Sequence, residues 1–257
     1  MDEEVSAAAP DLLRRLTIPM AAAVAIVVAI AWYITWASTD GMMMALAPGM
    51  LGSTDLAVFF ALNVVMMVAM MLPSALPMVL AYRGLTRLEG GVAVRPADDV
   101  GTFAFLIPYF VVWGAFGMAA LLGLTALGLL GPWTGLALFV PAATLGAAGV
   151  WQVTRTKEVC LAHCTSPMGF VVHHWRPGRL GAMRMGARHS LYCIGCCWLF
   201  MVVLFVAGAT SLAWMGLASI AIFVEKLGVR PLLVSRAIGV LLVALGVIAA
   251  FAATLAM

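Results

Sequence analysis

The stretch HSLYCIGCCWLFMVVLFVAG, residues 189–208, is apolar enough to cross a membrane, yet it begins with one histidine and three cysteines. An α-helix turns about 100° per residue, so His189, Cys193 and Cys196 fall within about 60° of one another. Cys197 widens this arc to about 100°. One stripe of the helix therefore carries every soft metal ligand of the segment. This stripe faces a metal ion, a redox partner or only a neighbouring helix.

The amino-acid composition is that of an integral membrane protein. Of the 257 residues, 65% are hydrophobic and 10% are charged, and the mean hydropathy is +1.11. A soluble domain cannot bury so much apolar surface. Backbone groups in hydrocarbon must bond internally, and long apolar runs favour helices over a barrel. We therefore expect an all-α fold, a polytopic helical membrane bundle of about seven transmembrane helices. The predicted spans are Ile18–Trp36, Leu56–Leu80, Phe103–Leu124, Trp133–Val153, Ser190–Val206, Ser211–Glu225 and Ala237–Thr254.

The fourteen Lys and Arg residues predict the orientation of these helices. With seven crossings, all the polar segments that carry cations lie on one side, and the positive-inside rule makes that side cytoplasmic. The N-terminus is then cytoplasmic, with residues 1–17 as a tail. Residues 18–257 form a single membrane domain with a cytoplasmic Cys/His segment at 154–189. The net charge of +3 reflects this topology, and no nucleic-acid partner is expected.

A second group of soft ligands lies in the segment CLAHC, residues 160–164. If the fourth helix continues past Val153, Cys160, His163 and Cys164 share one face because they are spaced i, i+3 and i+4. This face then lies at a depth similar to that of the stripe on the fifth span. Reduced cysteine together with histidine suits copper(I) or zinc. The alternative is that the cysteines are small hydrophobic side chains that pack between helices.

Glu225 is a carboxylate at the end of the sixth span, where a charged group is a functional-site hypothesis by default. A tight connection folds the sixth span back on the fifth, which places Glu225 beside Cys193. There it could bind a metal, accept a proton from a thiol or hydrogen-bond to His189. The alternative is an interfacial ion pair with Lys226 or Arg230.

The second span carries sulfur atoms on one face in the sequence ALNVVMMVAMMLPSALPM. Met66, Met67 and Met70 lie within about 60° of Asn63 around the helix, and aliphatic side chains occupy the opposite side. This face could form a transit or secondary site for a soft cation, or it could be ordinary helix packing. Four methionines lie in the preceding loop: Met42, Met43, Met44 and Met50. They could capture copper(I), or they could belong to a helix that lies in the membrane interface.

Three stretches of the chain resemble a bacterial family of predicted metal-binding integral membrane proteins. They are NVVMMVAMMLPSALPM, CLAHCTSPMGFVVHHWRPGRLGAMRMGARHSLYCIGCCW and WMGLASIAIFVEKLG. The resemblance covers roughly residues 55–240, and the Cys/His block is its most specific part. It implies a multi-pass protein of the bacterial inner membrane that binds a metal.

The preferred hypothesis is an integral membrane protein that binds a soft metal ion, copper(I) before zinc, in metal handling or delivery. The expected ligands are Cys193, Cys196 and His189, then Cys160, His163, Cys164 and Cys197, with Glu225 as a supporting group and Met66, Met67 and Met70 as a transit site. Its expected partners are the lipid bilayer and a membrane or periplasmic protein.

Two other functions stay open. One is a membrane redox enzyme that uses the C-x-x-C pair of Cys193 and Cys196, or that holds a haem through His189 or His163. The other is a non-catalytic assembly or scaffold subunit, so the sequence leaves open whether the chain is an enzyme. It contains no ATP-binding motif, and ATP-driven pumping by this chain alone is not expected.

Overall fold

The structure, a computed structural model, describes residues 2–38, 52–87, 99–129, 134–208 and 211–256. All regular structure in these ranges is helical, which confirms the predicted all-α class. The methionines at 42, 43, 44 and 50 lie outside the described residues. The helices are α1 (Asp2–Ala37), α3 (Ser53–Arg87), α4 (Asp99–Ala126), η1 (Gly135–Phe139), α5 (Val140–Trp151), α6 (Arg155–Thr165), α7 (Pro167–His174), α8 (Gly178–Gly208), α9 (Leu212–Leu227) and α10 (Pro231–Leu255).

Among the described residues, five helices are long and apolar enough to cross a membrane, and a sixth crossing is possible if one bent pair forms a single span. The five segments are Ile18–Ala37, Ser53–Gly84, Asp99–Ala126, Gly178–Val206 and Pro231–Leu255. The bent pair joins Gly135–Trp151 to Arg155–Thr165 at an angle of 67°. The predicted span Ser211–Glu225 corresponds to α9, whose 16 residues extend only about 24 Å. The count of seven is therefore not confirmed.

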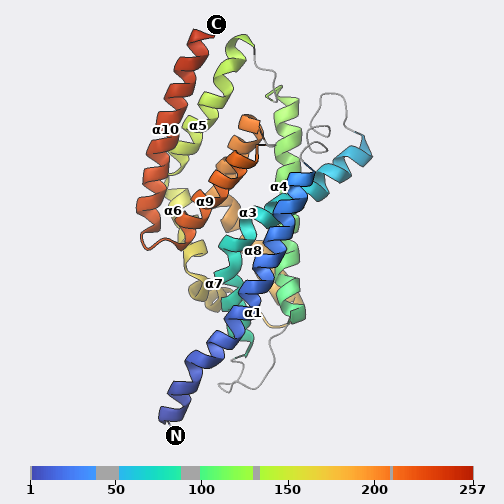
Figure 1. Cartoon of the computed structure of the whole chain (residues 1–257), viewed down its shortest axis with the longest axis vertical. Coiled ribbons are helices and arrows are strands. Elements are labelled where there is room, and N and C mark those ends of the chain that lie inside the picture. The colour runs from blue at the N-terminus through green and yellow to red at the C-terminus, as the bar shows by residue number, and fades with distance from the viewer. Residues whose placement is uncertain (1, 39–51, 88–98, 130–133, 209–210, 257) are drawn as a thin grey trace.

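Figure 1 shows the two ends of the chain at opposite ends of the molecule's long axis. The cytoplasmic position of the N-terminus stays a prediction.

Local signals in the sequence explain why the cysteine-bearing helices begin where they do. Thr154 accepts a hydrogen bond from the backbone N–H of Lys157, which caps α6 and separates it from α5. Pro167 occupies the first turn of α7, where its missing N–H costs nothing. Gly178 adopts a φ of +76°, a left-handed conformation that glycine tolerates, as the chain turns into α8.

Helix α8 is the centre of the bundle. Within its apolar segment 61% of the residues are buried, whereas the other four candidate spans reach at most 44%. It packs most extensively against α4, and also against α5, α6 and α9. The main hydrophobic core therefore contains the cysteine stripe of α8 together with methionines of α3 and aromatic residues of α4.

Gly186 allows α8 to approach α4 closely, because a Cβ atom at this position would overlap the backbone carbonyl of Phe105. We expect Gly186→Ala to lower the free energy of unfolding by about 1–3 kcal/mol, since backbone atoms must move. Thermal unfolding in detergent, followed by circular dichroism, measures this loss. Gly216→Ala in α9 is the matched control, since a Cβ atom there meets nothing within 4 Å. An equal loss in both variants would contradict the packing argument.

Candidate metal centre

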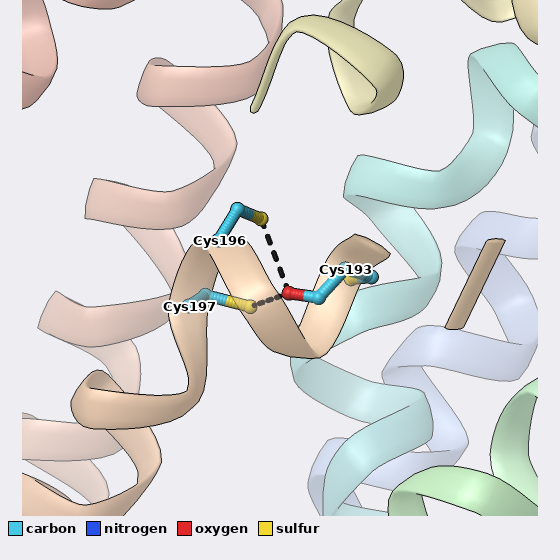
Figure 2. A group of neighbouring side chains, drawn as sticks. All are labelled: Cys193, Cys196 and Cys197. Atoms are coloured by element: carbon cyan, nitrogen blue, oxygen red, sulfur yellow. Dashed lines mark hydrogen bonds between the residues drawn. The ribbon is translucent and has the colours of Figure 1, made fainter. Parts of the chain in front are cut away.

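Three cysteine sulfurs from one helix form the centre of the candidate site. Cys193, Cys196 and Cys197 all lie on α8, and their Sγ atoms are within 4.8 Å of one another. Each of the three residues is at most 1% exposed. Figure 2 shows the Cys196 and Cys197 thiols directed towards the carbonyl oxygen of Cys193, to which they donate at 3.1 and 2.8 Å. Helical spacing alone brings these sulfurs together, as the sequence predicted.

A fourth sulfur reaches this group from α6. The Cys164 Sγ atom lies 3.9 Å from that of Cys196, and Cys164 is buried. The Cys160 side chain packs against α8 at Gly195, where an added Cβ atom would meet its sulfur. The two cysteine faces predicted from the sequence thus meet in the structure. All five cysteines are free thiols.

Polar groups from two other helices contact the sulfur of Cys193, and a third helix supports one of them. The hydroxyl of Tyr109 on α4 lies 3.0 Å from its sulfur. Lys226, near the end of α9, donates from Nζ to the same sulfur at 2.9 Å and to the hydroxyl of Ser74 on α3 at 3.4 Å. Lys226 is 7% exposed, so its positive charge is held close to the sulfur and away from water. Such a charge offsets the negative charge of thiolates bound to a metal ion.

Glu225 does not extend the sulfur cluster. Both of its carboxylate oxygens contact the Nζ of Lys157 on α6, at 2.7 and 2.8 Å. The predicted alternative of a pair with Lys226 or Arg230 is therefore wrong. A helix turns about 100° per residue, so Lys226 points to the cysteines while its neighbour Glu225 points to α6. Lys226 was not among the site residues predicted from the sequence, where it appeared only as an alternative partner for Glu225.

His189 lies one turn before Cys193 on α8 and is 2% exposed. Its ring stacks on that of Tyr109 with centroids 5.4 Å apart, and the rings of Phe105 and Phe170 also pack against it. Its Nδ1 atom has no hydrogen-bond partner in the described part of the chain. The ligand atoms that lie mutually within 4.8 Å include neither His189 nor Glu225. His189 is therefore linked to the sulfur cluster only indirectly: its ring stacks on Tyr109, whose hydroxyl lies 3.0 Å from the Cys193 sulfur.

His163 lies on α6 beside Cys164, and its ring contacts Tyr192 and lines a pocket between α6 and α7. The ring stacks on Tyr192 with centroids 4.1 Å apart, and its Nδ1 contacts the carbonyl of Val159 at 2.8 Å. His163 therefore precedes Cys164 in the sequence but does not belong to the three-sulfur group.

The methionine face of α3 lies in the same core as the cysteines. Met66, Met67 and Met70 are each at most 2% exposed and belong to the cluster that contains Cys193 and Cys196. Asn63 is 0% exposed, and neither of its amide atoms has a hydrogen-bond partner among the residues that the structure describes. The thioethers are thus buried near the sulfur cluster, and their role as a transit site stays a prediction.

Taken together, the fold and this cluster define a helical protein that has spans apolar enough for a membrane and a buried group of thiols suited to a soft metal ion. The sequence model of one family, PpoB2, described as a copper chaperone, matches residues 60–249. The chain belongs to this PpoB2 copper chaperone family. Searches of curated proteins and of solved structures gave no match.

Membership supports the predicted relation to a metal-binding family, in particular a copper-related one. The matched region contains all the candidate ligands from Met66 to Glu225.

Proposed function

We propose that this protein is a membrane copper chaperone that binds copper(I) at Cys193, Cys196 and Cys197 and passes it to an acceptor protein. One observation carries the proposal: three sulfurs, all buried, lie within 4.8 Å of one another. Thiolates are the soft ligands that select copper(I). The description of the family agrees with this chemistry.

The number of ligands favours copper(I) over zinc. Structural zinc sites in proteins use four tetrahedral ligands. The mutually close group contains three sulfurs, and Cys164, whose sulfur lies 3.9 Å from that of Cys196, is not part of it. We therefore assign the three sulfurs of α8 as ligands of copper(I) and Cys164 as an exchange ligand. His189 acts through Tyr109, and the ion pair of Glu225 with Lys157 holds α6 against α9.

We place this chaperone in the bacterial inner membrane, with the cysteine-bearing ends of α6 and α8 towards the cytoplasm. The concentration of cations in the polar segments near these helices supports that orientation. The acceptor is a membrane or periplasmic protein, and the methionine face of α3 serves as a secondary site along the route.

The ammonium group of Lys226 is expected to strengthen copper binding by balancing the charge of the thiolates. Lys226→Met should weaken the affinity for copper(I) about tenfold or more, by analogy with other groups that support metal ligands. Competition with a chromogenic copper(I) chelator measures this affinity. Lys226→Arg should restore most of it, and Arg230→Met, at an exposed position on the same side, should change little. Equal affinities in all of these variants would contradict the role of Lys226.

Copper binding itself is tested on the full-length chain purified in detergent under reducing conditions. We expect about one copper(I) ion per chain after loading and removal of weakly bound metal, and little zinc retained in competition. An absorption spectrum of the same sample addresses the haem alternative, since a Soret band would favour it. Absence of retained copper would overturn the proposed function.

A further inference from the structure

A pocket on the surface of the protein is lined by imidazoles that the buried sulfur cluster does not use. It has a volume of about 410 Å³ and lies between α6 and α7. Three of the four histidines of the chain line it: His163 from α6, and His173 and His174 from α7.

Hydrogen bonds fix the tautomer of these histidines. The Nδ1 atoms of His163 and His174 contact the carbonyl oxygens of Val159 and Phe170 at 2.8 and 3.0 Å. A carbonyl oxygen can only accept a hydrogen bond, so each Nδ1 carries the proton. In a neutral imidazole the other nitrogen, Nε2, then has a free lone pair. This is the arrangement that metal-binding histidines use, with one nitrogen on the backbone and the other on the ion.

Aromatic stacking holds the two rings in place. The ring of His163 lies parallel to that of Tyr192, with an angle of 3° between the planes and centroids 4.1 Å apart. The ring of His174 stacks on Phe170 at 4.6 Å. His173 bonds to the carbonyl of Gly169 in the same way, but no ring in the described part of the chain packs against it. His163 and His174 are therefore the preorganised pair.

The distance between the two rings suits a shared metal ion. Their centroids are 6.4 Å apart. In metal sites an imidazole nitrogen lies about 2 Å from the ion, and the ring centre lies about 1 Å further away, so two imidazoles on opposite sides of one ion have centres about 6 Å apart. The observed separation of 6.4 Å is close to this value, so the spacing of the two rings is compatible with a shared ion.

The imidazole pair is also continuous with the sulfur cluster. His163 is followed directly by Cys164, whose sulfur lies 3.9 Å from that of Cys196. Neighbouring positions on α6 thus present one ligand to the surface pocket and the next to the buried cluster. The backbone of α6 therefore connects the pocket directly to the sulfur cluster.

We propose that His163 and His174 form a metal port, through which copper(I) passes between the surface and the buried cysteines. The role of the port rests on the proposed function. In the inward transfer, a bond from copper(I) to the sulfur of Cys164 forms as its bond to an imidazole nitrogen breaks. The thiol proton moves to the released Nε2 atom, and copper(I) keeps its oxidation state. Transfer then continues to Cys196.

The port is first tested without reference to copper, using zinc as a redox-inert probe of the imidazoles. In the full-length Cys193→Ser/Cys196→Ser variant, isothermal titration should show zinc binding that disappears when His163→Gln and His174→Gln are added. His173→Gln in the same background is the matched control and should retain the binding. Zinc binding that survives the loss of both histidines, or that depends instead on His173, would overturn the port.

The second test measures transfer. Protein with native cysteines is loaded with copper(I), and release to a chromogenic chelator is followed over time. We expect the His163→Gln/His174→Gln variant to hold the same amount of copper(I) but to release it about tenfold more slowly, whereas His173→Gln should match the wild type. Unchanged release would contradict the port even if the cysteines bind copper(I). Failure of the wild type to bind copper(I), together with positive zinc titrations, would instead reject the proposed function and leave the imidazole site.

Discussion

Removing one charge from the Lys157–Glu225 pair is expected to destabilise the protein by about 3–5 kcal/mol, because it leaves the other charge buried without a partner. The two side chains are 1% and 0% exposed, and their closest atoms are 2.7 Å apart. The Lys157 ammonium also lies 5.2 Å from the ring centre of Phe200, which adds a cation–π contact. The pair joins α6 to α9 and so fixes the helices that carry Cys164 and Lys226.

The measurement is a double-mutant cycle by reversible unfolding in detergent. Lys157→Met and Glu225→Leu should each show the large loss, and the double variant Lys157→Met/Glu225→Leu should recover much of it, since it contains no unpaired charge. The exposed pair of Arg236 and Glu158, at 3.3 Å, is the control, and Arg236→Gln should cost less than about 1 kcal/mol. Losses that simply add in the double variant would show that the pair is not coupled.

Replacing two of the clustered cysteines is expected to abolish copper binding. In Cys193→Ser/Cys196→Ser, two of the three mutually close sulfurs become hydroxyl oxygens, which bind copper(I) poorly. Copper retained after dialysis against a competing chelator should fall from about one ion per chain to less than about a tenth of that. Elemental analysis measures the content, and circular dichroism checks that the variant is folded.

Cys160→Ser is the matched control for this loss. Cys160 is partly exposed and lies outside the three-sulfur group, so its replacement should leave most of the copper in place. Equal copper content in the double variant and the wild type would remove the cysteines of α8 from the site.

The sequence predicted the sulfur cluster because local helix geometry determines it. Cys193, Cys196 and Cys197 are spaced i, i+3 and i+4, and any helix through this segment places them on one side. The approach of Cys164 was predicted only as a second face at similar depth, and the structure adds the 3.9 Å distance to Cys196.

Other features depend on the packing of helices that are distant in sequence. The pair of Lys157 and Glu225 joins positions 68 residues apart, and the rotation of α9 decides whether Glu225 or Lys226 faces the cysteines. Hydropathy could not determine this rotation. It also did not reveal that the fourth predicted span ends at Trp151 and resumes after a bend of 67°.

The most direct test of copper(I) binding by the cysteines is X-ray absorption at the copper edge. The full-length protein is loaded under reducing conditions with no more than about one equivalent of copper(I). If the cysteines of α8 bind copper(I), we expect the nearest neighbours of the ion to be sulfur atoms, as soft thiolate ligation requires. A nearest shell made of nitrogen or oxygen atoms, or no bound copper at all, would contradict this binding.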